Sequence, residues 1–149
     1  MRTITGDLVA LAKDGAFDLI AHGCNCMCTM GAGIALPIRK TWPDVFDADL
    51  RTQSGDRAKL GTCTQAIVAS GKLTVVNAYT QFDYRGDGVK VDYDAVARCM
   101  AWIKDNHSGK RSGLPKIGAG LAGGDWSRIE AIVTEELTNE DVTVVAFAG

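Results

Sequence analysis

Two segments of this 149-residue chain set closely spaced glycines just ahead of a helical pattern. The first is Gly31-Ala32-Gly33-Ile34, which follows a strand-like run, and the second is Gly118-Ala119-Gly120-Leu121-Ala122. Glycine lets a ligand approach the main chain closely, and the N-terminal end of a helix presents backbone N–H groups to an anion. The two segments therefore predict a site for the phosphates of a nucleotide-type ligand.

Each segment alone could also be no more than a tight turn. The first is not followed by the Gly-Lys-Ser/Thr of a Walker loop, and it lacks the spacing of a Rossmann fingerprint. Loops at the carboxyl ends of strands in an open α/β sheet share one crevice, however. Two strand-to-helix loops on one chain therefore favour a shared cleft over two unrelated turns.

His22 is the side chain best suited to proton transfer, because it lies near the carboxyl end of a strand-like run. An imidazole with an ordinary pKa of about 6.5 can act as a general acid or base at neutral pH. The alternative is a core histidine that makes only a structural hydrogen bond.

Three cysteines alternate closely, at Cys24, Cys26 and Cys28, and two more are isolated, at Cys63 and Cys99. Zinc sites usually have two or more residues between paired ligands and a distant second pair. This spacing predicts reduced thiols with no metal and no other cofactor.

The composition is that of one ordinary globular domain, which we expect to span residues 1–149 as a monomer. A formal net charge of −2 offers no field of Lys and Arg for binding duplex nucleic acid. No apolar run approaches the roughly 20 residues of a membrane span, and there is no signal-peptide core. We therefore expect a cytoplasmic protein with no membrane partner.

Strand-like and helical patterns alternate along the chain. Six segments are apolar and strand-like: 2–5, 17–21, 63–68, 73–78, 114–117 and 142–147. Three segments have helical periodicity: 34–40, 92–106 and 127–137. Asp92 can cap the second helix and either Asp125 or Ser127 the third, while Trp42-Pro43 is typical of a helix end. The pattern predicts a three-layer α/β/α fold with a mixed central sheet of about six strands, in which a hairpin turns near Gly71-Lys72.

Four motifs in this order resemble the macrodomain family, and the resemblance covers nearly the whole chain. The motifs are Gly6-Asp7-Leu8, Leu19-Ile20-Ala21-His22-Gly23-Cys24-Asn25, Met30-Gly31-Ala32-Gly33-Ile34-Ala35 and Pro115-Lys116-Ile117-Gly118-Ala119-Gly120-Leu121. Macrodomains bind ADP-ribose and its derivatives, and many hydrolyse them. The chain is most similar to the branch of ADP-ribose-1″-phosphate phosphatases. A compact domain of this family suits a bacterial or phage gene, in the latter case acting in the host cytoplasm.

The resemblance implies a role for each matching residue. Asp7, with Leu8 beside it, would bind adenine by accepting a hydrogen bond from its amino group, and Phe147 would stack on the ring. Asn25 would meet the distal ribose. The diphosphate would lie between two main-chain segments, Gly31, Ala32, Gly33 and Ile34 on one side and Gly118, Ala119, Gly120, Leu121 and Ala122 on the other.

Catalysis in this interpretation falls to His22 and Asn25, with His22 orienting water or protonating the leaving ribosyl oxygen. The glycine-bearing loop 79–88 could close over the distal end of the ligand, with Gln81 as a contact, or could be an ordinary surface loop.

The resemblance implies as the leading function an enzyme that removes the phosphate from ADP-ribose-1″-phosphate. The alternatives are removal of ADP-ribose from a macromolecule and binding without turnover. The branch that hydrolyses ADP-ribosyl-glutamate relies on a Lys after the hairpin and on an Asp after the second glycine segment. Here residues 77–82 contain no Lys and Leu121 is followed by Ala122, which disfavours the second function.

Overall fold

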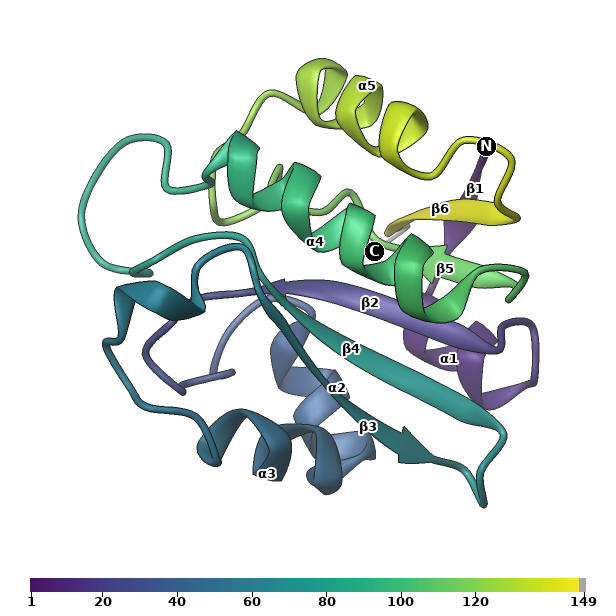
Figure 1. Ribbon diagram of the computed structural model, residues 1–149. Helices are drawn as coiled ribbons and strands as arrows, with labels where there is room; N and C mark the ends of the chain where they lie inside the picture. Colours follow the sequence, from purple (N-terminus) through teal and green to yellow (C-terminus); the bar gives the residue numbers. More distant parts are fainter. Residues whose placement is uncertain (148–149) are drawn as a thin grey trace.

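The computed structural model describes residues 1–147, which form a six-stranded sheet between two layers of helices (Figure 1). The strands are β1 (Arg2–Gly6), β2 (Leu19–Cys24), β3 (Cys63–Val68), β4 (Leu73–Tyr79), β5 (Ser112–Leu114) and β6 (Val142–Phe147). They lie in the order β1-β6-β5-β2-β4-β3, and every neighbouring pair is parallel except the β3–β4 hairpin. This mixed sheet confirms the predicted fold class.

Helices cover both faces of the sheet (Figure 1). One layer contains α4 (Tyr93–His107) and α5 (Trp126–Glu136); the other contains α1 (Leu8–Lys13), α2 (Ala35–Thr41) and α3 (Pro43–Leu50), and a 3₁₀ turn, η1 (Arg57–Lys59), follows α3. The carboxylates of Asp92 and Asp125 cap α4 and α5 by accepting hydrogen bonds from Ala95 N and Ser127 N. Local side chains therefore start both long helices where the sequence predicted.

The structure differs from the sequence predictions in three elements. The chain ends α2 at Thr41, as Trp42-Pro43 predicted, but Pro43 then opens α3, because proline is tolerated at the first position of a helix. The short helix α1 was also not predicted. The predicted strand 114–117 is wrong beyond Leu114, since Pro115 cannot donate to a ladder and its carbonyl accepts from Ile117 N instead.

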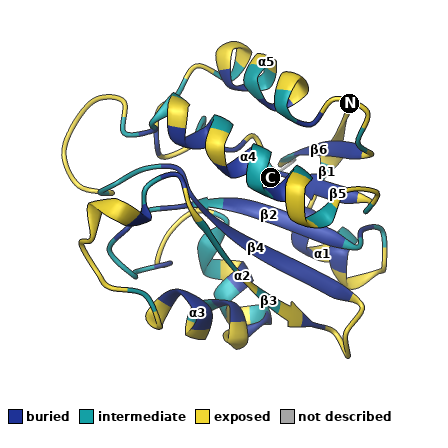
Figure 2. Cartoon of the chain, viewed as in Figure 1, coloured by how far each residue is buried: buried dark blue, intermediate teal, exposed yellow. Residues whose placement is uncertain are grey.

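Two apolar cores lie on the two faces of the sheet. Leu19, Ala21 and Val76 pack under α4 and α5, whereas Ile20 and Val75 pack against α1, α2 and α3. Alternate residues of one strand point to opposite faces, so both central strands are buried along their length (Figure 2). The sheet is therefore a rigid platform for the loops that leave its edge.

Three chain segments approach each other closely at Gly23, near the end of β2. A Cβ at Gly23 would lie 2.7 Å from Thr80 Oγ1 and 3.2 Å from Ile117 Cγ1. Thr80 directly follows β4, and Ile117 belongs to the connection from β5 to α5. Only glycine lets the segments that follow β4 and β5 pack this tightly on either side of β2.

His22 is fully buried on the face of β2 that packs against α3. Asn77 Nδ2 donates to Val45 O and to Thr64 Oγ1, so Asn77 Oδ1 is the acceptor for His22 Nε2–H at 2.7 Å. Burial lowers the pKa of His22 from its ordinary 6.5 to about 4, and the Asn77 hydrogen bond offsets only part of this effect. The imidazole is therefore neutral at pH 7, with its proton on Nε2.

Of the helices in residues 1–147, none is both long enough and apolar enough to cross a bilayer.

The buried imidazole makes stability depend on pH. Because the folded pKa of His22 lies below the unfolded value, folding is favoured above pH 6.5 and loses stability as the pH falls toward 4. Linkage predicts a loss of roughly 2 kcal/mol between pH 7 and pH 5 from this residue. Urea unfolding of the wild type at the two pH values measures it.

In His22→Gln the difference between pH 7 and pH 5 should shrink by about that amount, while the overall stability falls. His107→Gln is the comparison, because His107 is the other histidine of the chain and lies half-buried at the end of α4. Partial burial lowers the pKa of His107 as well, so this variant should reduce the pH dependence less than His22→Gln does. An unchanged pH dependence in His22→Gln would contradict the assignment of a neutral, buried imidazole.

Candidate functional site

A cavity of about 800 Å³ lies at the edge of the sheet where β2, β4 and β5 end. Its lining includes residues of both glycine segments, residues 31–34 of the first and residues 118 and 120–122 of the second. The volume lies within the usual range of small-molecule sites. The structure thus brings the two predicted segments to one cavity.

The two glycine segments also contact each other across the mouth of the cavity. Gly33 has φ +58, and a Cβ there would lie 3.3 Å from Leu121 Cδ1. Leu121 is 71% exposed although it is apolar, so it projects over the opening rather than into the core. The two glycine segments therefore lie close together at Gly33 and Leu121, both of which line the cavity.

The glycines of the second segment have two different purposes. Gly118 has φ +76 and a Cβ there would lie 2.7 Å from Val91, while a Cβ on Gly124 would lie 2.6 Å from Gly118 O. These two are required by the packing of the loop itself. A Cβ on Gly120, in contrast, would meet no protein atom within 4 Å, although Gly120 lines the cavity.

Ala119 is the exception in this segment. It packs, partly buried, against the core under α4 and α5, and it is not among the residues that line the cavity. Its predicted contact with a ligand is therefore not supported, because the turn at Gly118 directs it away from the opening.

Asn25 directly follows β2, and Gln81 lies two residues beyond the end of β4. Asn25 Oδ1 accepts from Met27 N at 2.8 Å, and its Nδ2 donates to Thr29 Oγ1 at 2.9 Å. The backbone of Gln81 donates to Cys24 O, which joins the β4–α4 loop to the end of β2. Both residues line the cavity, as the sequence predicted.

His22 is not among the cavity-lining residues, in contrast to Cys24 two positions further along the same face of β2. Cys24 Sγ lies 3.6 Å from His22 Nε2 and stands between the imidazole and the opening. This placement is at odds with a proton shuttle, since the ring touches neither the cavity nor water. The alternative of a core histidine agrees with the geometry.

The residues predicted to bind adenine lie along the same edge of the sheet but outside the cavity lining. Asp7 Oδ1 accepts from Ala10 N and caps α1, and Leu8 is buried in the core, where no ligand can reach it. Phe147 is 77% exposed at the end of β6, and it pairs with Gly6, the residue before Asp7. Asp7 and Phe147 are therefore neighbours, and their contact with adenine stays a prediction.

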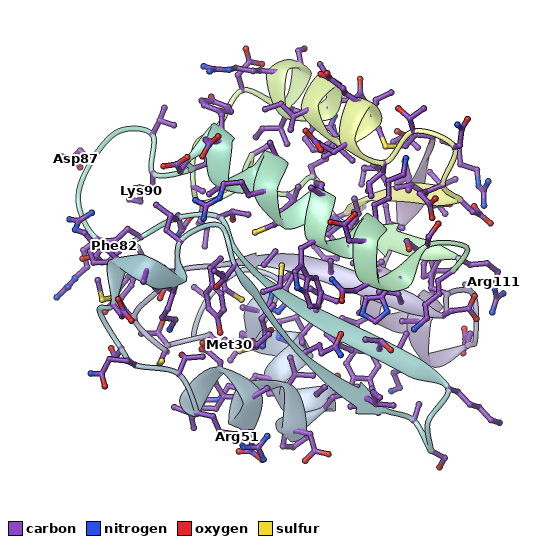
Figure 3. The ribbon with its side chains drawn as sticks, viewed as in Figure 1. Met30, Arg51, Phe82, Asp87, Lys90 and Arg111 are labelled. Atoms are coloured by element: carbon purple, nitrogen blue, oxygen red, sulfur yellow. The ribbon has the colours of Figure 1, made fainter. Side chains whose placement is uncertain are left out.

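The lining also includes two charged side chains that sequence reasoning did not identify, Asp49 and Lys90, and Tyr84 from the loop 79–88. Lys90 is on the loop from β4 to α4, which stands out from the end of the sheet; Figure 3 shows Phe82 and Lys90 on its two arms and Asp87 at the outer bend. The available signal was the polar, aromatic and glycine-bearing composition of this loop. Asp49 belongs to the unpredicted helix α3.

Lys90 is the only cation that lines the cavity in the part of the chain that the structure describes. No carboxylate of residues 1–147 lies within 4.0 Å of its Nζ, which donates only a long hydrogen bond to Gly88 O. Asp49 is the only carboxylate in the same lining, and its Oδ1 accepts from Tyr79 OH at 2.7 Å. The described lining therefore contains one cation, Lys90, and one carboxylate, Asp49, which already accepts a hydrogen bond from Tyr79.

All five cysteines are free thiols, and burial raises the pKa of Cys24 and that of Cys26, the latter to about 11. Within residues 1–147, no three His, Cys, Asp or Glu side chains are grouped to hold a metal ion.

Comparison with known proteins shows similarity along the whole chain. The chain is 35% identical over 152 residues to an uncharacterized 17.5 kDa protein of Enterobacteria phage T4, encoded in the tk-vs intergenic region, with 97% of this chain and 95% of the relative covered. A macrodomain protein from Streptomyces coelicolor has a similar structure, with a TM-score of 0.73, 26% identity and coverage of 99% and 98% of the two chains.

The fold is also shared with Thermosipho africanus DarTG, whose structure was solved in complex with ADP-ribose. The TM-score is 0.76 at 18% identity, over 97% of this chain and 40% of that one. The sequence model of the macro domain matches residues 21–133. This match covers most of the chain, from the middle of β2 into α5, and includes both walls of the cavity, so the chain belongs to the macrodomain family.

Proposed function

We propose that this chain binds ADP-ribose in the cavity between its two glycine segments. The observation that carries the proposal is that residues 31–34 and residues 118 and 120–122 line one cavity of about 800 Å³. The similarity in fold to a protein solved with ADP-ribose supports the choice of ligand.

The diphosphate would lie between the two segments and accept hydrogen bonds from backbone N–H groups. Consecutive amides in turns form concave sites for anions without any cationic side chain. This explains how a chain with a net charge of −2 could hold a doubly charged ligand. Adenine would then reach along the edge of the sheet to Asp7 and Phe147, and the distal ribose would reach Asn25.

The finer proposal is that the chain acts on ADP-ribose-1″-phosphate and releases its phosphate. The specific observation in its favour is Lys90, a half-buried ammonium group without a carboxylate partner in the described chain, near Gln81 at the distal side. A terminal phosphate on the distal ribose would supply the missing anion. Removal of ADP-ribose from a macromolecule and binding alone are the other outcomes of the test.

Hydrolysis would need water activated by a group that reaches the cavity, and buried His22 does not. Asp49 is the only carboxylate of the described lining, which makes it the first residue to examine as a general base. We therefore propose His22 as a structural residue whose hydrogen bond to Asn77 holds β2 and β4 in place.

Binding can be tested with Gly120→Val. The new side chain would meet no protein atom near its Cβ and would fill the space proposed for the diphosphate, so the fold should persist while the affinity for ADP-ribose falls. We expect a loss of at least about ten-fold, because displaced phosphate would leave the amides of the cavity unpaired. Titration calorimetry with ADP-ribose measures the change.

Ala131→Val is the matched control, since it adds similar bulk on the exposed surface of α5, away from the cavity. Its affinity for ADP-ribose should equal that of the wild type. No heat of binding from wild-type protein with any ADP-ribose compound would overturn the proposed function.

The phosphate ester can be tested with Lys90→Met. A charge-assisted hydrogen bond contributes roughly 1.5–3 kcal/mol, so the affinity for ADP-ribose-1″-phosphate should fall about ten-fold. The affinity for ADP-ribose should change less than about two-fold, because no phosphate reaches Lys90 in that ligand. Lys116→Met is the control, as Lys116 is exposed on the neighbouring loop and does not line the cavity.

Incubation of the wild type with ADP-ribose-1″-phosphate and with ADP-ribosylated protein then separates the three functions. Phosphate release supports the phosphatase, release of ADP-ribose from the protein supports the second function, and binding without either product supports a binding module. Equal losses for both ligands in Lys90→Met would rule out its role in selecting a phosphate ester.

A further inference from the structure

Lys59 is a buried lysine directly behind the distal end of the cavity. It ends the 3₁₀ turn η1 and is only 6% exposed. Lysine is seldom buried in proteins unless its ammonium group is paired and hydrogen-bonded. The atoms that contact the Lys59 ammonium group therefore indicate why this side chain is buried.

The ammonium group of Lys59 contacts the loop that follows β2. Nζ donates to Cys26 O at 3.2 Å and to Cys28 Sγ at 3.4 Å, and it lies 4.6 Å from the centre of the Tyr79 ring. The Asp49 carboxylate is further away, at 3.8 Å. The loop atoms lie nearer to Lys59 Nζ than the Asp49 carboxylate does. The burial of Lys59 therefore holds the loop as well as pairing its charge with Asp49.

The loop at residues 25–30 needs such support, since two of its non-glycine residues have left-handed backbone. Cys28 has φ 59 and Met30 has φ 43. Such conformations persist only where surrounding contacts impose them. Met30 is held by burial in the core, and Ser54 Oγ and Gly55 N hold Met27 O and Cys26 O from the outer side. Lys59 supplies the inner support, beneath Cys26 and Cys28.

The same loop holds the side chain of Asn25. Both ends of its amide are bonded within the loop, to Met27 N and to Thr29 Oγ1. The orientation of Asn25 in the cavity therefore depends on the path of the backbone through Cys26 and Cys28, which Lys59 contacts.

We infer that Lys59 is a positioning residue, which sets the orientation of Asn25 toward the distal ribose without touching the ligand. The inference rests on the proposed binding of ADP-ribose. In this interpretation the glycine segments hold the diphosphate. The contact with the distal ribose depends instead on Lys59, which acts through the loop at residues 25–30.

The test compares ADP-ribose with ADP, which lacks the distal ribose, in Lys59→Met. The affinity for ADP-ribose should fall about ten-fold, since small displacements of a positioning group are costly. The affinity for ADP should stay within about two-fold of the wild-type value, as expected where only the ribose contact is lost. When Asn25→Ala is already present, Lys59→Met should cause little further loss of affinity for ADP-ribose, because both residues act through the same contact with the distal ribose.

Two further variants serve as controls. Lys59→Arg keeps the positive charge and should recover most of the affinity for ADP-ribose. Lys72→Met removes an exposed lysine at the hairpin and should change neither affinity. Because Lys59→Met leaves Asp49 without its cation, urea unfolding of this variant is measured as well, so that affinities are compared only between folded proteins.

Equal losses for ADP and ADP-ribose, or additive losses with Asn25→Ala, would overturn the inference. Failure of the wild type to bind either ligand would instead overturn the proposed function. Wild-type binding of both ligands together with an unchanged preference in folded Lys59→Met would contradict the inference alone.

Discussion

The architecture of the site depends on the close packing of three segments at Gly23. β2 pairs in parallel with β4 on one side and with β5 on the other, which brings three carboxyl ends to one edge. Thr80 and Ile117 then pack on Gly23 so tightly that no Cβ fits between them. A side chain there would push apart the connections that follow β4 and β5, which form the walls of the cavity. The shape of the cavity therefore depends on the packing of the sheet as much as on the glycine segments.

Features that a few neighbouring residues determine could be predicted from the sequence. Asp92 and Asp125 start their helices through a single side-chain hydrogen bond, and the glycine segments begin where strands end. The short helix α3 could not be predicted in this way, because its eight residues give little periodicity and it is held mainly by packing on β3 and β4. Asp49 was missed for the same reason.

The burial of His22 argues against the role in proton transfer that its residue type suggests. Its position near the end of β2 was predicted, and so was the alternative of a core histidine. What the sequence could not show is that Cys24 stands between the ring and the cavity, or that Asn77 on the neighbouring strand accepts a hydrogen bond from the ring. The contact with Asn77 depends on strand register, which joins residues 55 positions apart. Lys59 escaped notice for a related reason, since its partners lie about 30 residues earlier in the chain.

The glycine segments and the side chains that line the rest of the cavity have different roles. This difference explains why family membership identifies the fold but not the reaction. Main-chain amides of the glycine segments are the same whatever side chains surround them, so a diphosphate site can persist across very different sequences. The distal end is built from side chains instead, with Asn25 held by its own loop and Lys90 presented by the β4–α4 connection. In the proposed complex, substitutions of these side chains would change which group beyond the diphosphate is accepted. The proposed reaction would therefore depend on these side chains, since the backbone of the glycine segments would bind only the diphosphate.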